Sequence, residues 1–161
     1  MIMFGLFRSS PFTDPQLGEL VRSRGKWRGH FDCAGDRVPV IVDGSKKEPD
    51  GESLAEARRA IGALDEWRGS IARALFEHLE PYAESIAAGE LPAPEDFDLS
   101  SITSPADVWP HATLLYVSAG KLDGVMTTEL GYSTSWDEEH TLGVRFRSGQ
   151  FAGLCGSVLA P

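Results

Sequence analysis

The sequence predicts an α+β domain, in which an antiparallel sheet carries one long amphipathic helix packed on one face. Two observations support this class. Apolar residues recur every three or four positions between residues 54 and 86, which is the period of an amphipathic helix. Runs that alternate apolar and polar residues precede and follow this segment, as is typical of half-buried strands. The length of 161 residues fits a single domain over 1–161.

Before the helix, the sequence predicts a three-stranded antiparallel meander. The runs 17–21, 26–31 and 38–42 are rich in strand-forming residues, and Arg24-Gly25 supplies a turn between the first two. Pro39 lacks the N–H that a strand ladder needs, so it places the third strand at an edge or stands at its start.

The helix has recognisable start and stop signals. Ser53 and Glu56 match a capping box, in which the Ser hydroxyl and the Glu carboxylate satisfy free N–H groups in the first turn. A proline clashes with the carbonyl four residues earlier, so Pro81 predicts a main helix that ends near Leu79 and a shorter one that reaches residue 88. Gly89 is then a suitable C-terminal stop.

Residues 90–110 form the least regular segment, with prolines and acidic residues spread along it. Ser104 to Asp107 can open a helical turn, with Ser104 as the cap and Pro105 at the first helical position. Long loops in compact domains are often functional, so this acidic segment is a candidate contact surface for a partner; a simple crossover is the other interpretation.

Four strands are predicted in the last third of the chain, at 112–118, 125–132, 141–147 and 150–158. Ser148-Gly149 forms a two-residue hairpin turn between the last two. Cys155 is in phase with Phe151 and is predicted to be a small buried residue.

Trp136-Asp137-Glu138-Glu139-His140 is the strongest candidate for chemistry, because an aromatic ring, three carboxylates and an imidazole fall within five residues. Extending the strand backwards from residue 141 places Glu138 and His140 on the apolar face and Asp137 and Glu139 on the opposite face. Neighbours on one strand face lie roughly 6.5–7 Å apart, so Glu138 and His140 could hold a metal or move a proton. The structural interpretation is a solvated acidic turn beside a hydrogen-bonded histidine.

Three of the four histidines closely follow a tryptophan: His30, His111 and His140. If the three strand ends converge, these imidazoles and the carboxylate of Glu138 could form a zinc site. In the alternative, the tryptophans belong to the core and the histidines are incidental. The sequence contains no metalloprotease helix motif, nucleophile elbow, phosphate-binding loop or dinucleotide fingerprint.

Charge and composition limit the partners. Acidic residues outnumber Lys and Arg by 24 to 15, for a net charge of −9, which argues against nucleic acid and against an anionic membrane. A basic protein partner is the natural complement. The apolar opening of residues 1–8 is too short for a signal peptide, and no apolar run approaches the roughly 18 residues of a membrane span. Two cysteines are too few for a disulfide framework, so we expect a cytoplasmic protein.

The run Asp107-Val108-Trp109-Pro110-His111, followed by strands and then by residues 136–140, resembles a family of uncharacterised bacterial domains marked by a Trp-Asp-x-Glu-His motif. The resemblance covers the last third of the chain. It departs from the family pattern at Thr141, where a glycine often follows the histidine. Some of these domains are similar to immunity proteins of bacterial toxin systems, which implies binding without catalysis.

The leading hypothesis is therefore a cytoplasmic protein-binding module, possessing no catalytic activity and no cofactor. Its candidate binding residues are Trp136, Asp137, Glu138, Glu139, His140, Trp109 and His111. The alternative is a zinc-type hydrolase that uses the 136–140 motif, whose candidate metal ligands are His140, Glu138, His111 and His30.

Overall fold

One eight-stranded sheet and one 37-residue helix make up the fold in the computed structural model, which describes residues 8–96 and 98–161. The apolar opening discussed above lies outside the described residues, except for residue 8. The elements in chain order are β1 (Phe12–Asp14), β2 (Gly18–Ser23), β3 (Lys26–Cys33), β4 (Asp36–Val42), α1 (Gly51–Ala87), the short 3₁₀ helices η1 (Leu99–Ser101) and η2 (Pro105–His111), β5 (Ala112–Leu122), β6 (Val125–Thr134), β7 (Asp137–Arg147) and β8 (Gln150–Val158).

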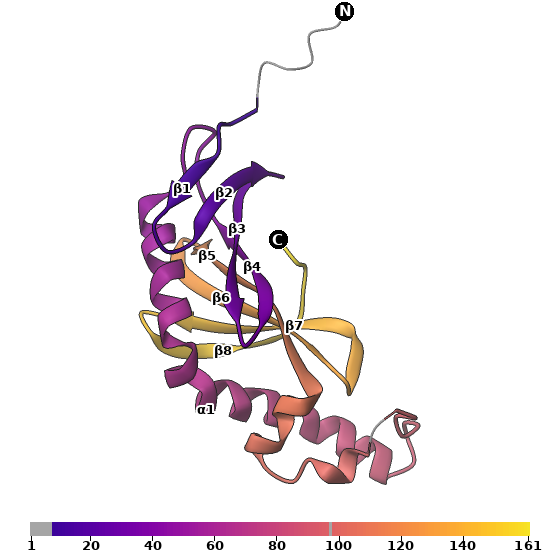
Figure 1. Ribbon diagram of the computed structural model, residues 1–161. Helices are drawn as coiled ribbons and strands as arrows, with labels where there is room; N and C mark the ends of the chain where they lie inside the picture. The colour runs from indigo at the N-terminus through magenta and orange to yellow at the C-terminus, as the bar shows by residue number, and fades with distance from the viewer. Residues whose placement is uncertain (1–7, 97) are drawn as a thin grey trace, which may run out of the picture.

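The strands lie in the sheet in the order in which they occur in the chain. Neighbouring strands are antiparallel, as predicted, with one exception: β4 and β5 are parallel, with Val40 beside Val117. The connection between these two strands is the long segment that contains α1, because parallel neighbours need a crossover. The predicted N-terminal meander has a fourth strand, since β1 pairs with β2. In Figure 1, α1 runs from beside the N-terminal strands to the far end of the molecule.

The start of α1 differs from the predicted capping box. Asp50 is the N-cap, and its carboxylate accepts hydrogen bonds from the Ser53 N–H at 2.9 Å and from the Ser53 hydroxyl at 2.8 Å. Glu56 is unavailable for a capping box because it is buried and accepts a hydrogen bond from the Thr128 hydroxyl on β6 at 2.9 Å. A contact between helix and sheet therefore replaces the local contact that the spacing predicted.

The predicted helix end near Leu79 is wrong, because α1 continues through Pro81 to Ala87. Pro81 is exposed, so the carbonyl that loses its partner at this turn can be solvated. The stop at Gly89 is confirmed: this residue has φ +76° and its N–H donates to the Ile86 carbonyl at 3.0 Å.

The main hydrophobic core lies between α1 and the helix-facing side of β5 to β8. Its centre is the Trp67 ring, which stacks on Phe146 of β7 with ring centroids 3.9 Å apart and an interplanar angle of 7°. Leu75 of α1 and Leu130 of β6 are fully buried in the same cluster. This packing confirms the predicted two-layer α+β arrangement, with the helix on one face of the sheet.

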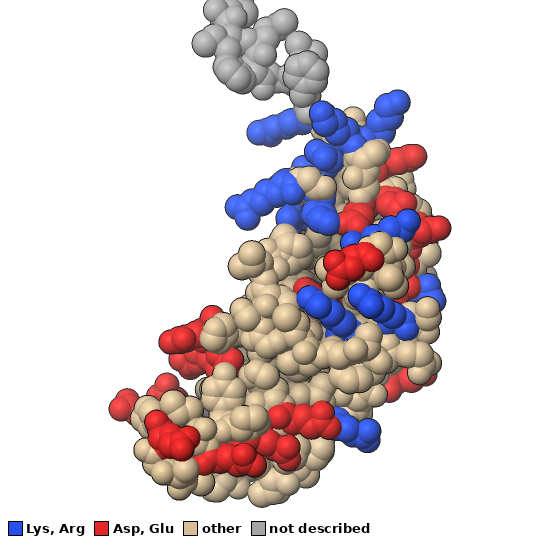
Figure 2. Space-filling model, turned by 180° about the vertical axis from the view of Figure 1, so that it is seen from behind, with Lys and Arg blue, Asp and Glu red and all other residues tan. Residues whose placement is uncertain are grey.

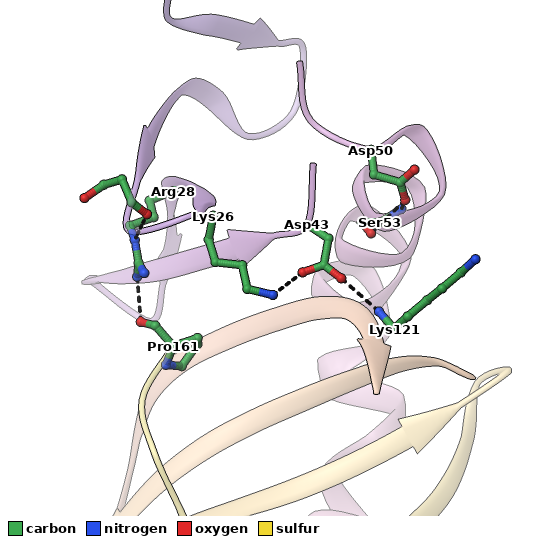
Figure 3. A network of polar contacts seen from close by, with 8 residues as sticks. Lys26, Arg28, Asp43, Asp50, Ser53, Lys121 and Pro161 are labelled. Atoms are coloured by element: carbon green, nitrogen blue, oxygen red, sulfur yellow. Dashed lines mark hydrogen bonds and ion pairs between the residues drawn. The ribbon is translucent and has the colours of Figure 1, made fainter. Parts of the chain in front are cut away.

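Polar contacts join the two halves of the sheet near the parallel pair (Figure 3). The Asp43 carboxylate, just after β4, forms an ion pair with Lys26 of β3 and accepts a hydrogen bond from the Lys121 N–H of β5 at 3.0 Å. Gly120 allows this approach, because a Cβ at that position would lie 2.2 Å from an Asp43 oxygen. The side chain of Arg28 also donates to the carbonyl of Pro161 at 2.6 Å.

The last third of the chain follows most of its predicted pattern. The helical turn is confirmed as η2, where Ser104 and Asp107 form a capping box with Pro105 at the first position. The four C-terminal strands are present, and both residues of the Ser148-Gly149 turn have positive φ. Cys155 is only half-buried, contrary to the prediction, because β8 is an edge strand. None of the helices in the described residues is long and apolar enough to cross a membrane.

Candidate functional site

The 136–140 motif lies at the junction of β6 and β7, and its register differs from the predicted one. Tyr132 pairs with Leu142, but Thr134 pairs with Asp137, so β7 has more residues than β6 between these two pairs. The irregularity turns Asp137 toward α1 and into the protein, while Glu138 is exposed. The prediction that Glu138 and His140 share the apolar face is therefore wrong.

Asp137 is the centre of a polar cluster that joins β7 to α1. Its residue exposure is 6%, and its carboxylate has partners on both oxygens. The Tyr82 hydroxyl donates to Oδ2 at 2.8 Å, and His140 Nδ1 lies 2.8 Å from Oδ1. His78 Nε2 lies 4.0 Å from Oδ2. A buried carboxylate is tolerated because these partners replace the water that it loses.

Trp136 determines which ring nitrogen of neutral His78 carries the proton. The indole Nε1–H of Trp136 lies 3.1 Å from His78 Nδ1, and an indole nitrogen can only donate. Nδ1 must therefore accept, which leaves the proton of the neutral ring on Nε2, the nitrogen nearer to Asp137. Trp136 itself is 7% exposed, so the ring serves the interior of the cluster and offers little surface to a partner.

The environment shifts the pKa of three members of the cluster. Burial raises the pKa of the Asp137 carboxyl, but the hydrogen bonds from His140 and Tyr82 outweigh it and lower the pKa overall. Burial lowers the pKa of His78, against the pull of Asp137. Burial and the hydrogen bond to Asp137 raise the pKa of Tyr82. At neutral pH the cluster therefore holds a carboxylate, a neutral His78 and a protonated Tyr82.

We expect His78 to carry its proton on Nε2 at pH 7 and to remain neutral as the pH falls through about 6.5, the usual pKa of histidine. The pKa of His78 is lower in the folded than in the unfolded protein. Its contribution to the free energy of unfolding is therefore complete above the unfolded pKa and is lost as the pH falls through the folded pKa. Long-range ¹H–¹⁵N imidazole spectra measure the tautomer. Trp136→Phe should abolish the preference, and an Nδ1 proton on His78 in the wild type would contradict this account.

An acidic groove runs beside this cluster. It has a volume of about 510 Å³ and is formed by the end of α1, the segment 91–96, Ser135 and the 136–140 motif. Ile86 and Leu91 contribute apolar surface, and Leu91 is 44% exposed. The exposed polar residues of its lining are Glu95, Asp96, Glu138, Glu139 and His140. The structure thus brings the irregular acidic segment and the motif, 40 residues apart in the chain, to one surface.

The groove lies at the acidic end of the molecule. Residues 74–120 contain no Lys or Arg but hold the eight acidic residues Glu77, Glu80, Glu84, Glu90, Glu95, Asp96, Asp98 and Asp107. Asp137, Glu138 and Glu139 add three more at the groove. Figure 2 shows acidic side chains gathered at the lower end and most Lys and Arg in the upper half. The end of the molecule that holds the groove is therefore strongly acidic, whereas the opposite end carries charges of both signs.

The predicted convergence of His30, His111 and His140 is not observed. Over residues 8–96 and 98–161, no group of three or more His, Cys, Asp and Glu side chains is arranged to hold a metal. His30 is exposed on β3, where it pairs with Pro39. His111 approaches the motif through its backbone, since its carbonyl accepts a hydrogen bond from the Ser135 N–H at 2.9 Å.

Trp109 lies apart from the motif, with the Arg68 guanidinium 4.1 Å from the centre of its ring. Among the predicted binding residues, Glu138, Glu139 and His140 are thus the exposed members at the groove. Asp137 is buried beneath them.

Sequence reasoning missed His78 and Tyr82. They lie four residues apart, on one face of α1. The signal that could have found them is a pair of polar rings at helical spacing along an otherwise apolar stripe. Their partner on β7 depends on how the helix docks, which the spacing does not specify.

Comparison with protein families gives one match. The family model described as "Domain of unknown function (DUF6985)" matches residues 16–155, which run from β2 into β8 and include α1 and the whole motif. Comparisons with curated proteins and with solved structures gave no match.

Proposed function

The chain belongs to the family described as Domain of unknown function (DUF6985), and we propose that it is a protein-binding module whose acidic groove binds a basic segment of a partner protein. One observation carries the proposal: the acidic segment and the motif lie around one groove. Residues 74–120, which include the acidic segment, contain no Lys or Arg. Complementary charge steers such encounters and fixes their register.

The composition of the groove suits Lys and Arg side chains. Ile86, Leu91 and Pro92 provide apolar surface for their methylene stems, and the exposed carboxylates Glu138 and Glu139 lie in the same lining for their charged ends. Long basic side chains bury their stems while their charges stay near water or a carboxylate. An extended basic segment would thus gain both apolar burial and charge pairing.

The buried cluster supports the groove from below. Asp137 joins β7 to Tyr82 of α1, and both residues line the groove. The same carboxylate orients the exposed His140 through Nδ1. A surface held by two elements that are tied together loses less conformational entropy when it binds.

An immunity-like role is one form of this proposal. In that form the protein acts in the cytoplasm and its partner is a basic toxin domain, which the acidic groove neutralises by occupying its cationic surface. The net charge of −9 supports fast association with such a partner.

Charge reversal in the groove tests the proposal. Glu138→Lys with Glu139→Lys should weaken partner binding at least about tenfold, because like charges then face the basic segment. The matched control is Glu19→Lys with Glu48→Lys, two exposed carboxylates outside the groove lining that give the same change in net charge. Wild type, variant and control are immobilised, exposed to native lysate and washed with rising salt.

We expect the wild type and the control to retain the same proteins and to release them as the salt rises. The groove variant should not retain these proteins. Equal retention by the groove variant would contradict the proposal, as would a lysate from which the wild type retains nothing.

The zinc-type hydrolase is a second candidate for one reason. A carboxylate that orients the Nδ1 side of an exposed imidazole, as Asp137 does for His140, is also found behind catalytic and metal-binding histidines. A zinc-dependent rise in the melting temperature of wild type that His140→Ala abolishes would favour this candidate.

A further inference from the structure

A second cavity lies between the middle of α1, the β3–β4 turn and the start of β5. Its volume is about 260 Å³, and its lining combines apolar residues such as Leu64, Ile71 and Leu114 with Arg68, Trp109 and Tyr132. An apolar cavity of about 150 Å³ is large enough for benzene, so this space accommodates one aromatic ring with a substituent. We call it the Tyr132 cavity. None of its lining residues belongs to the acidic groove.

Tyr132 supplies a hydroxyl that is open to the cavity and has no described hydrogen-bond partner. The residue is 4% exposed on β6, and no described residue forms a hydrogen bond with its hydroxyl. Arg68, which also lines the cavity, favours the ionised form of this hydroxyl, but burial outweighs that effect. Burial raises the pKa of Tyr132, so this hydroxyl stays protonated and can donate. An acceptor group of a ligand in the cavity would take the place of water at this donor.

Arg68 supplies a second donor group. Its guanidinium lies over the Trp109 ring, 4.1 Å from the centroid, and no described carboxylate forms a salt bridge with it. Stacking occupies the face of the guanidinium and leaves the N–H groups at its edge free to pair with a carboxylate. Asp36 and Asp65 are exposed members of the same lining, so they disfavour a ligand with several negative charges.

We propose that the Tyr132 cavity binds a small aromatic monocarboxylate. Its ring packs against Leu114, Ile71 and the Trp109 side chain, and its carboxylate accepts hydrogen bonds from the Tyr132 hydroxyl and from Arg68. The single negative charge pairs with Arg68, and the same carboxylate accepts from the Tyr132 hydroxyl. The proposal is independent of partner binding at the acidic groove.

Benzoate, benzyl alcohol and benzylamine test the proposal in parallel titrations of ¹⁵N-labelled protein. Benzoate should shift the amides of residues 64–71 and 109–114 in a saturable manner and bind more tightly than either other compound. Tyr132→Phe should weaken benzoate roughly five- to tenfold through the lost donor. Tyr116→Phe, which removes a hydroxyl that is bound to Glu129 outside both this cavity and the acidic groove, should leave benzoate affinity unchanged.

Three results would overturn the proposal: no saturable shift with benzoate, equal affinity of benzylamine, or unchanged benzoate affinity in Tyr132→Phe. The melting temperature of Tyr132→Phe without ligand gives a further check. It should be close to that of wild type, because the hydroxyl has no hydrogen bond to a described residue to lose, and a clear decrease would show that the hydroxyl has a partner in the protein.

Discussion

Asp137→Ala should lower the free energy of unfolding by about 3 kcal/mol, because a hydrogen bond to a charged group contributes roughly 1.5–3 kcal/mol and this carboxylate has two polar partners. Asp137 is 6% exposed, accepts a hydrogen bond from Tyr82 and binds His140, so the substitution removes one partner from each at once. It also leaves the C-terminal part of α1 without its polar link to β7. Urea unfolding of wild type and variant at pH 7 measures the difference.

The effect of Asp137 should depend on pH in a defined direction. Its folded pKa lies below the unfolded value of about 3.9, so its stabilisation is complete above that value and is lost as the pH falls through the folded pKa. The wild type and Asp137→Ala should therefore converge in strongly acidic solution. Glu138→Ala, an exposed neighbour, is the control and should change stability by less than about 0.5 kcal/mol at pH 7. One ordinary hydrogen bond contributes roughly 1 kcal/mol to stability. A smaller loss than this for Asp137→Ala would contradict the role of Asp137 in the cluster.

Trp67→Ala should lower the free energy of unfolding by about 3–5 kcal/mol. The Trp67 ring is 6% exposed and stacks on Phe146, so its removal leaves a large cavity between α1 and β7. Chemical unfolding followed by circular dichroism measures this loss independently of the missing tryptophan fluorescence. Trp67→Phe should cost less, since a ring remains against Phe146, and Glu66→Ala on the exposed face is the control. Equal stability of Trp67→Ala and wild type would exclude the packing described here.

Local patterns predicted the elements of this fold well. The period of apolar residues identified α1, and the alternation around Leu142, Val144 and Phe146 identified β7, because both patterns reflect which side of an element is buried. The Ser104 cap and the Ser148-Gly149 turn were also predictable, since their chemistry involves only neighbours in the chain.

The errors occur where distant residues compete with local ones. Glu56 has the spacing of a capping box, but Thr128 on the sheet takes its carboxylate, and Asp50 caps the helix instead. At the motif, the irregular pairing of Tyr132 and Thr134 reverses the predicted faces, and simple alternation cannot foresee it. The partners of Asp137 depend on the docking of α1.

The acidic end of the molecule is visible in the sequence as a long stretch without Lys or Arg. Net charge alone predicted a basic partner, whereas the absence of Lys and Arg over residues 74–120 predicts where that partner would bind. The groove itself required the structure, because it joins this segment to residues 135–140.

The most direct test of the account is to map a basic ligand on the protein. An arginine-rich peptide is titrated into ¹⁵N-labelled wild type at low and at physiological salt, with the Glu138→Lys, Glu139→Lys variant alongside. The account predicts saturable, salt-sensitive shifts at residues 82–96 and 135–140 in the wild type and their loss in the variant. Shifts confined to other surfaces, or equal binding by the variant, would contradict the assignment of the acidic groove as the binding site.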